Sequence, residues 1–286
     1  MIAGIPIGVV YGLVAYAFTL TYRSCGVFNF GIGQVAVVGA LTYISFSGWL
    51  QRWPGLIAAV LFMIPIGALV YFAFLRLPER RGADPVILII ITLGLGTVAQ
   101  YGAPRIWGYY ALPAPSLFDG SVSIGSHVIT YQRLIVVGLA AVVLVLVFAF
   151  ERFTTLGKAM IATGVDREAA IISGVDDRLV QGLAWGMSFS IAALAGMLIA
   201  PLTSASMGSA AILATNGFSA AIIGGLGNSF GAFVGGIGMG LASSVAAVLL
   251  SPGYADAIAF SAVIVFILFR PAGLLGDAKA LVGPRA

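Results

Sequence analysis

The chain offers few side chains suited to covalent chemistry. It has one cysteine, Cys25, and one histidine, His127, which excludes a disulfide framework, a thiolate metal cluster and a site with several histidines. Its only Gly-Lys pair, Gly157-Lys158, lacks the upstream glycine and the following serine or threonine of a phosphate-binding loop. The sequence therefore predicts no catalytic residue, no metal site and no cofactor bound by this chain, and we expect a protein that is not an enzyme.

The most informative polar stretch lies within residues 151–178, the most hydrophilic part of the chain. Asp166 is a good helix N-cap, and Glu168 adds negative charge near the positive end of the helix dipole. Gly174 suits the left-handed position that ends a helix, and Asp176 can cap the next one. About seven residues between the caps predict a short helix of roughly 10 Å.

This short helix has two interpretations. Ala169 and Ala170 give it a low-relief face, and Ile171 and Ile172 give it an apolar one. It is either a linker helix lying in the membrane interface or a rigid docking element for a cytoplasmic partner.

Four amide side chains lie in two glycine-rich breaks of otherwise apolar runs: Asn29, Gln34, Asn216 and Asn228. Unpaired polar groups are costly in lipid, so broken backbone at membrane depth must face protein or a water-filled cavity. One interpretation is a translocation path in which these amides meet the zwitterionic head of an amino acid. Hydrogen bonding between helices accounts for the same residues equally well.

The elements that hold these residues are predicted from composition. Of 286 residues, 60% are hydrophobic and only 8% are charged, against about 25% charged in a soluble domain. A membrane span needs about 20 apolar residues. We predict an all-α polytopic transmembrane bundle with 8 to 9 crossings, at residues 5–22, 30–50, 56–77, 86–101, 134–150, 179–200, 212–226, 230–250 and 255–269. The run 212–226 is short and broken, so it either crosses or re-enters, and the alternation of the other runs favours a crossing.

The bases lie mostly on one side of this predicted membrane. If residues 151–178 are cytoplasmic and the runs alternate, eleven of the fourteen bases lie inside, and only Arg52, Arg105 and Arg133 lie outside. This agrees with the excess of Lys and Arg in cytoplasmic loops. We therefore predict the N-terminus outside and the C-terminus inside a cell membrane. The scattered bases and net charge of +4 exclude a nucleic-acid partner.

No charged residue falls in the middle of a predicted span, and Asp256 comes closest, at the outer end of the last one. Ion-driven carriers usually place a carboxylate or histidine within the membrane. An active transporter built on this chain must therefore take its energy from another subunit.

Two glycine series have the spacing of close helix contacts. Gly227, Gly231 and Gly235 repeat every four residues, as do Gly236 and Gly240. Such strips let a neighbouring backbone approach closely. We favour packing within the subunit over a dimer interface.

The segment Glu168-Ala169-Ala170-x-x-x-Gly174 resembles the EAA-x-x-x-G loop of ABC importer permeases, which docks into a groove of the ATPase subunit. Three further segments resemble those of branched-chain amino acid permeases, in the same order: residues 26–34, 220–232 and 269–276. The chain departs from the family at Gln34, where a carboxylate is common, and at Ile32-Gly33, where a His-Gly pair is common.

The resemblance implies a single permease domain over residues 1–286, with its coupling loop at about 151–178. It implies four kinds of partner besides the lipid bilayer: two ABC ATPase subunits that use the ATP, a second permease subunit (a paralogue or a copy) and an extracytoplasmic substrate-binding protein. The expected cargo is branched-chain or other hydrophobic amino acids. Urea, short amides and aromatic acids are alternatives within the family, and an ion-coupled secondary carrier is the alternative from another class.

Overall fold

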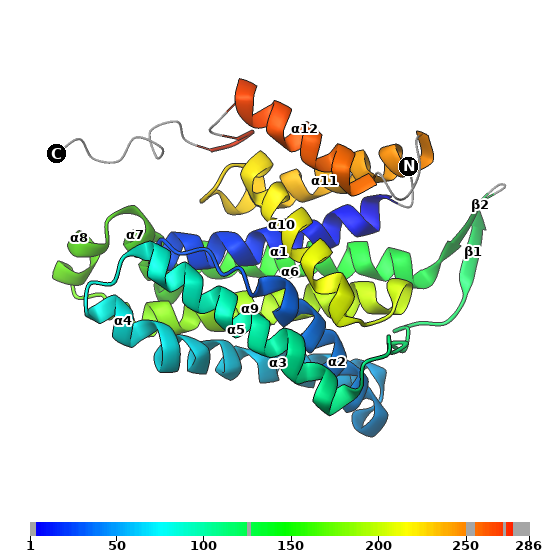
Figure 1. The fold of residues 1–286 in the computed structure, drawn as a ribbon, viewed down its shortest axis with the longest axis horizontal. Coiled ribbons are helices and arrows are strands. Elements are labelled where there is room, and N and C mark those ends of the chain that lie inside the picture. Colours follow the sequence, from blue (N-terminus) through cyan, green and yellow to red (C-terminus); the bar gives the residue numbers. More distant parts are fainter. Residues whose placement is uncertain (1–3, 125–126, 250–254, 271–272, 277–286) are drawn as a thin grey trace.

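The computed structural model describes residues 4–124, 127–249, 255–270 and 273–276. Eight helical segments in this part of the chain are long and apolar enough to cross a membrane, which confirms the all-α polytopic bundle (Figure 1). The long helices are α1 (Gly4–Cys25), α2 (Ile32–Leu50), α3 (Arg52–Val70), α5 (Pro85–Trp107), α6 (Tyr131–Phe153), α9 (Asp177–Thr203), α10 (Ala210–Gly224), α11 (Ser229–Leu249) and α12 (Ala255–Phe269). The short elements are α4 (Arg76–Arg80), α7 (Thr155–Val165), α8 (Arg167–Ile172), β1 (Ser121–Ile124) and β2 (His127–Thr130).

Helices α1 and α9 form the centre of the bundle. In each of them 89% of the most apolar stretch is buried, and α1 contacts α6, α9, α10 and α11. Helices α3, α5 and α6 lie at the periphery, where only 17% to 28% of that stretch is buried. Side chains such as Leu61, Ile90 and Leu146 are exposed on these flanks, as expected for a surface that faces lipid tails.

The two glycine series bring helices together inside this subunit. A Cβ added at Gly236 or Gly240 would lie 2.1–2.2 Å from backbone atoms of α1, and one at Gly231 or Gly235 would lie 2.2–2.3 Å from backbone atoms of α10. These four glycines therefore let α11 approach both neighbours at backbone contact. Gly227 is different, because it lies in the turn before α11 with φ +90° and is not part of the helical strip.

Several helix ends differ from the sequence prediction. The fourth span, predicted to end at Tyr101, continues through Pro104 to Trp107, since neighbouring groups in a membrane bundle can satisfy the backbone that a proline disrupts. The third span continues from α3 through a π-helical turn (Tyr71–Leu75) into α4. The fifth span extends to Phe153, so Glu151 belongs to the last turn of α6 rather than to a loop.

The polar segment after α5 forms a small hairpin that the all-α prediction did not include. Strands β1 and β2 pair antiparallel, with Ser121 opposite Thr130. The preceding loop is fixed to the start of α3 by an ion pair of 2.6 Å between Arg52 and Asp119. Hydrogen bonds from Ser116 and Arg52 lower the pKa of the Asp119 carboxyl.

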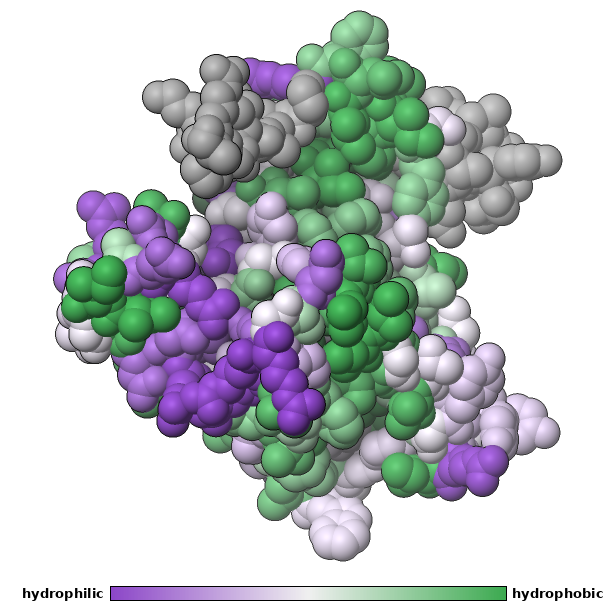
Figure 2. Space-filling view, turned by 60° about the vertical axis from the view of Figure 1, so that its left-hand side comes forward, coloured by the Kyte–Doolittle hydropathy of each residue, from purple (hydrophilic) through white to green (hydrophobic). Residues whose placement is uncertain are grey.

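The hairpin and helices α4, α7 and α8 mark opposite ends of the molecule (Figure 1). Hydrophilic residues gather at the α4–α8 end, beside a flank that is largely hydrophobic (Figure 2).

Together with the 3₁₀ turn Met207–Ser209, α10 makes a segment of 18 residues, long enough for the predicted crossing at 212–226. Two of the bases assigned to the inside, Lys279 and Arg285, lie outside the described residues.

The predicted orientation can be tested with two single cysteines in a Cys25→Ser background. Ser121 in β1 and Thr155 at the start of α7 are both exposed, at opposite ends of the molecule. We expect a membrane-impermeant maleimide to label Ser121→Cys in intact cells and Thr155→Cys only after permeabilisation. The reverse pattern would contradict the orientation with the N-terminus outside.

Candidate functional site

The short helix expected at Asp166–Gly174 is present as α8 and has the predicted ends. The side chain of Asp166 accepts a hydrogen bond of 3.0 Å from the amide of Ala169, and Gly174 has φ +89°. Asp176 caps α9 in the same way, through the amide of Arg178 at 3.0 Å. Both caps use side chains close in sequence to the amides they bind, which is why the sequence alone could predict them.

The two alanines of α8 do not share a face. Ala170 is buried, whereas Ala169 is exposed together with Glu168 and Ile172. Successive helical residues point about 100° apart, so two adjacent alanines cannot line one surface. Ala170 packs against the protein, and Glu168, Ala169 and Ile172 lie on the exposed side of the helix.

Helix α7, which the sequence prediction missed, packs against α8. It begins at Thr155, where the hydroxyl of Thr154 accepts a hydrogen bond of 2.9 Å from the amide of Gly157. A Cβ at Gly157 would lie 2.2 Å from the carbonyl oxygen of Phe150, so this glycine lets α7 fold back against α6. The signal available in the sequence was Thr154, a good N-cap residue at the end of a long apolar run.

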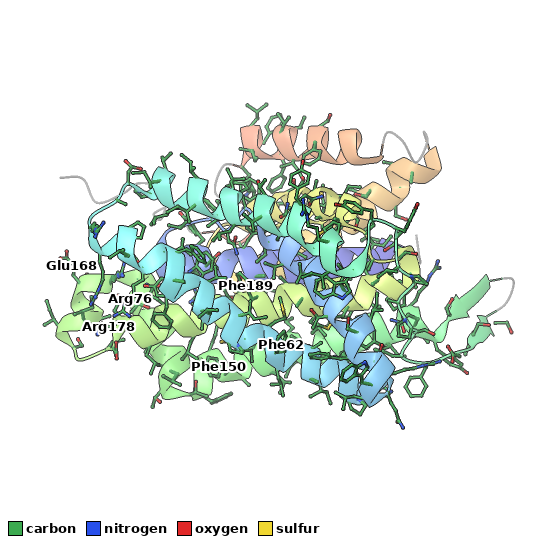
Figure 3. The ribbon with its side chains drawn as sticks, turned by 60° about the horizontal axis from the view of Figure 1, so that its bottom comes forward. Phe62, Arg76, Phe150, Glu168, Arg178 and Phe189 are labelled. Carbon is green, nitrogen blue, oxygen red and sulfur yellow. The ribbon has the colours of Figure 1, made fainter. Side chains whose placement is uncertain are left out.

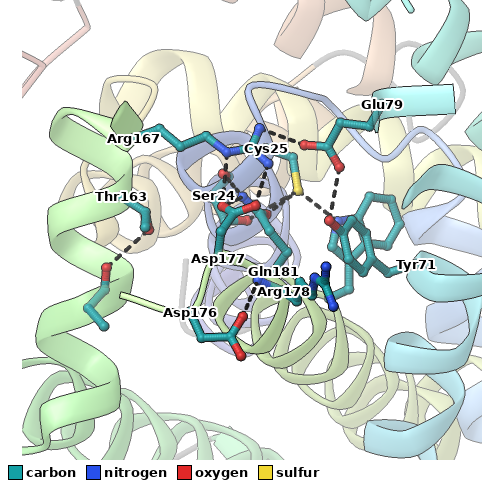
Figure 4. Close-up of polar contacts among 12 residues, drawn as sticks. Ser24, Cys25, Tyr71, Glu79, Thr163, Arg167, Asp176, Asp177, Arg178 and Gln181 are labelled. Atoms are coloured by element: carbon teal, nitrogen blue, oxygen red, sulfur yellow. Dashed lines mark hydrogen bonds and ion pairs between the residues drawn. The ribbon is translucent and has the colours of Figure 1, made fainter. Parts of the chain in front are cut away.

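Arg167 clamps α8 to two other helices. Its guanidinium lies 2.6 Å from Glu79 of α4 and donates two hydrogen bonds, of 2.9 and 2.7 Å, to the carboxylate of Asp177 in α9 (Figure 4). Hydrogen bonds to Asp177, together with the charge of Glu79, raise the pKa of Arg167 above its ordinary value. Forked pairs of this kind are strong and directional. Any displacement of α8 must therefore act on α4 and α9.

The polar network continues from this clamp to the C-terminal end of α1 and the π-helical turn that follows α3. Tyr71, in the π-helical turn, donates a hydrogen bond of 2.9 Å to Glu79. Gln181, one turn after Asp177, donates to the carbonyl of Ser24 and accepts from the thiol of Cys25. The network thus links α8 to four helical segments, through residues far apart in sequence.

The first glycine-rich break lets the chain turn back along α1. After Gly26, which has φ +68°, Phe28 stacks on Tyr22 at 4.5 Å and Phe30 packs edge-on against Phe18 at 6.3 Å. Phe18 lies about two turns before the end of α1, a depth of about 10 Å. Helix α2 therefore starts inside the bundle rather than at its surface, and Phe218 of α10 covers the turn.

Asn29 and Gln34 lie in this break, both beside α5. Asn29 accepts a hydrogen bond of 3.0 Å from the amide of Gly31, and Gly31 meets Gly96 of α5 at backbone contact. The side-chain oxygen of Gln34 lies 3.4 Å from a Cβ added at Gly96. Among the described residues, neither the Asn29 amide nitrogen nor the Gln34 amide oxygen has a hydrogen-bond partner. The break thus holds one buried amide donor and one buried amide acceptor.

The other two amides lie elsewhere. Asn216 is buried and donates a hydrogen bond of 3.2 Å to the hydroxyl of Tyr11 in α1. Asn228 caps α11 through the amide of Gly231 at 2.9 Å and donates to the carbonyl of Leu275 at 2.9 Å. These two amides therefore join elements within the subunit, whereas Asn29 and Gln34 both lie beside Gly31 and Gly96.

A largely buried ion pair lies at the C-terminal end of α6. Glu151 accepts hydrogen bonds of 3.1 Å from both Tyr16 and Arg23, and Arg23 donates another of 2.8 Å to Ser229. This cluster joins α1, α6 and the start of α11. The sequence prediction missed it because Glu151 looked like the first residue of a hydrophilic loop.

Three curated proteins are similar to this chain over nearly its full length. The high-affinity branched-chain amino acid transport system permease protein LivH of Escherichia coli (strain K12) is 27% identical to this chain. The alignment covers 96% of this chain and 94% of LivH. The permease protein BraD of the same description, from Pseudomonas aeruginosa, shows the same identity and coverage. The probable branched-chain amino acid transport permease protein LivH of Methanocaldococcus jannaschii is 25% identical, and the alignment covers 92% of this chain and 88% of that protein.

A solved structure, PsaBC from Streptococcus pneumoniae in complex with Fab, has a TM-score of 0.50 at 13% identity. The aligned region covers 98% of this chain and 93% of the chain in the solved structure, and the likeness supports the fold alone. The family profile described as the branched-chain amino acid transport system permease component matches residues 1–268. With eight apolar spans and a match over nearly its whole length, this chain belongs to that family of membrane permeases.

Proposed function

We propose that this chain is the permease subunit of an ATP-driven ABC importer that moves branched-chain or other hydrophobic amino acids into the cell. The observation that carries the proposal is α8, a helix capped at both ends, exposed at Glu168 and clamped by Arg167 to two spans. The relatives described above are named as permeases of branched-chain amino acid transport, which supports the substrate class.

In this proposal the permease converts movement of its partners into movement of its spans. Two ATPase subunits dock on the inner face of the transporter, one of them on α8 of this chain, and consume the ATP, while the chain itself, one permease domain over residues 1–286, holds no cofactor. Closure of the ATPases displaces α8, and Arg167 carries the displacement to α4 through Glu79 and to α9 through Asp177. Gln181 carries it on to the inner end of α1.

The break at the start of α2 supplies the polar contacts of the path. A zwitterionic amino acid brings a carboxylate that needs donors and an ammonium that needs acceptors. The unpartnered amide nitrogen of Asn29 and amide oxygen of Gln34 match these two needs. Substrate arrives at the end that carries the β hairpin, delivered by an extracytoplasmic binding protein, and a second permease subunit completes the path.

The experiment that tests the proposal is uptake by the reconstituted transporter. The permease, its ATPases and its binding protein are placed in proteoliposomes, and uptake of labelled leucine is followed. We expect uptake to require ATP, to stop when the ATPase is catalytically inactive, and to survive collapse of the proton gradient by an ionophore. Uptake that needs the gradient and not the ATPase would identify a secondary carrier instead. Uptake of labelled urea, a short amide or an aromatic acid, with no uptake of labelled leucine, would reassign the substrate.

A further inference from the structure

A recess of about 330 Å³ opens beside α8 at the inner end of the bundle. Arg76 and Arg80 line it from α4, and Arg178 lines it from the first turn of α9. Glu168 and Ile171 of α8 line it as well. Figure 3 shows Glu168, Arg76 and Arg178 gathered at this end of the molecule. We call this cavity the arginine recess.

The arginine recess has guanidinium groups without partners. Its two other acids, Glu79 and Asp177, are both held by Arg167. Within the described part of the chain, no carboxylate lies within 4.0 Å of the guanidinium of Arg76, Arg80 or Arg178. Arg76 stacks on the ring of Phe72 at 5.3 Å, which leaves the hydrogen-bonding edge of its guanidinium free.

We propose that the arginine recess receives carboxylate side chains of the ATPase subunit that docks on α8. This inference rests on the proposed function, because it takes α8 as the ATPase contact. A protein that covers α8 also covers the recess, since Glu168 and Ile171 belong to both. Burying unpaired guanidinium groups is costly unless the partner supplies acceptors. Carboxylates match the planar fork of arginine donors, so the docking groove must be acidic where it faces Arg76, Arg80 and Arg178.

A matched pair of double variants tests the inference. Arg80→Gln/Arg178→Gln removes two charges from the recess, whereas Arg81→Gln/Arg152→Gln removes two charges from exposed arginines that do not line it. The affinity of the purified ATPase subunit for each permease is measured in neutral detergent without added lipid. We expect the recess variant to bind about tenfold more weakly and with a smaller salt dependence, and the control to bind as the wild type does.

Each other outcome overturns the inference in an identifiable way. Equal affinities of the two double variants would show that the ATPase places no carboxylate in the recess. A difference that appears only in phosphatidylglycerol vesicles, and not in phosphatidylcholine vesicles or detergent, would assign the recess to an anionic lipid headgroup. The variant Gly174→Val, which strains the end of α8 at φ +89°, reports on the docking helix itself. If the wild type does not bind the ATPase, or Gly174→Val binds equally well, the proposed docking at α8 fails as well.

Discussion

Replacing Arg167 by alanine should reduce ATP-driven uptake more than tenfold while the amount of permease in the membrane stays unchanged. The change removes both ion pairs that hold α8, and it leaves Glu79 and Asp177 facing a vacated space with only 13% and 21% of their side chains exposed. Breaking a partly buried charge pair on one side costs more than the pair contributes, because the remaining charges stay desolvated. The helix at the surface absorbs this cost by moving, so folding of the bundle is preserved and coupling is lost.

The expected size follows from coupling free energies. Two sites in a protein are typically coupled by about 1–3 kcal/mol, and about 1.4 kcal/mol corresponds to a factor of ten. The Arg167 side chain is 37% exposed, so solvent screening reduces the contribution of each of its pairs. The measurement is the initial rate of leucine uptake in proteoliposomes at fixed ATP, alongside the basal ATPase rate of the complex. We expect the ATPase rate to persist while uptake falls, which is the signature of uncoupling.

Two further variants separate loss of the clamp from repulsion between the acids. Arg152→Ala removes an exposed arginine at the same end and should leave uptake unchanged. The triple variant Arg167→Leu/Glu79→Gln/Asp177→Asn removes the clamp without leaving like charges together. We expect it to transport as poorly as Arg167→Ala. Full transport by Arg167→Ala would contradict the role of the clamp, and recovery in the triple variant alone would show that repulsion causes the defect.

Helix α8 shows which features of the site can be predicted from the sequence and which cannot. Asp166 could be identified because its side chain binds an amide three residues away, and Gly174 because the residue that ends a helix favours the left-handed conformation of glycine, so both signals are local. Arg167 sits directly beside Asp166, yet its role was missed, because Glu79 lies in another helix and no local pattern announces it. The membrane spans were predicted well for a similar reason, since length and hydropathy are properties of a single segment.

The break before α2 shows the opposite case. The sequence indicated that residues 26–34 are interrupted, but the direction of the chain there depends on contacts with α1, α5 and α10. Phe28 contacts Tyr22, and Gly31 contacts Gly96, only when these helices are assembled. The same limit applies to the amides. Asn216 pairs with Tyr11 and Asn228 caps α11, while Asn29 and Gln34 share a site, and nothing local distinguishes these environments.

The glycines of α11 allow one substitution to be tested in two contrasting environments. Gly236 and Gly238 lie two residues apart on the same helix. A Cβ at Gly236 would lie 2.2 Å from the backbone of Gly12 in α1, whereas a Cβ at Gly238 would meet nothing within 4 Å. Backbone atoms of a central helix cannot rotate away as a side chain can, so α1 and α11 must separate to accommodate even a methyl group.

The variants Gly236→Ala and Gly238→Ala should therefore change stability in opposite directions. Alanine favours a helix over glycine by about 1 kcal/mol, which is the whole effect expected at Gly238. At Gly236 overpacking of the helix contact costs about 1–3 kcal/mol, and the small-residue interface that replaces hydrophobic attraction in membranes is lost along with it. Thermal unfolding of the purified proteins in detergent gives the comparison, with a lower Tm and less folded permease expected for Gly236→Ala. Equal stability of the two variants would show that α11 does not depend on backbone contact with α1.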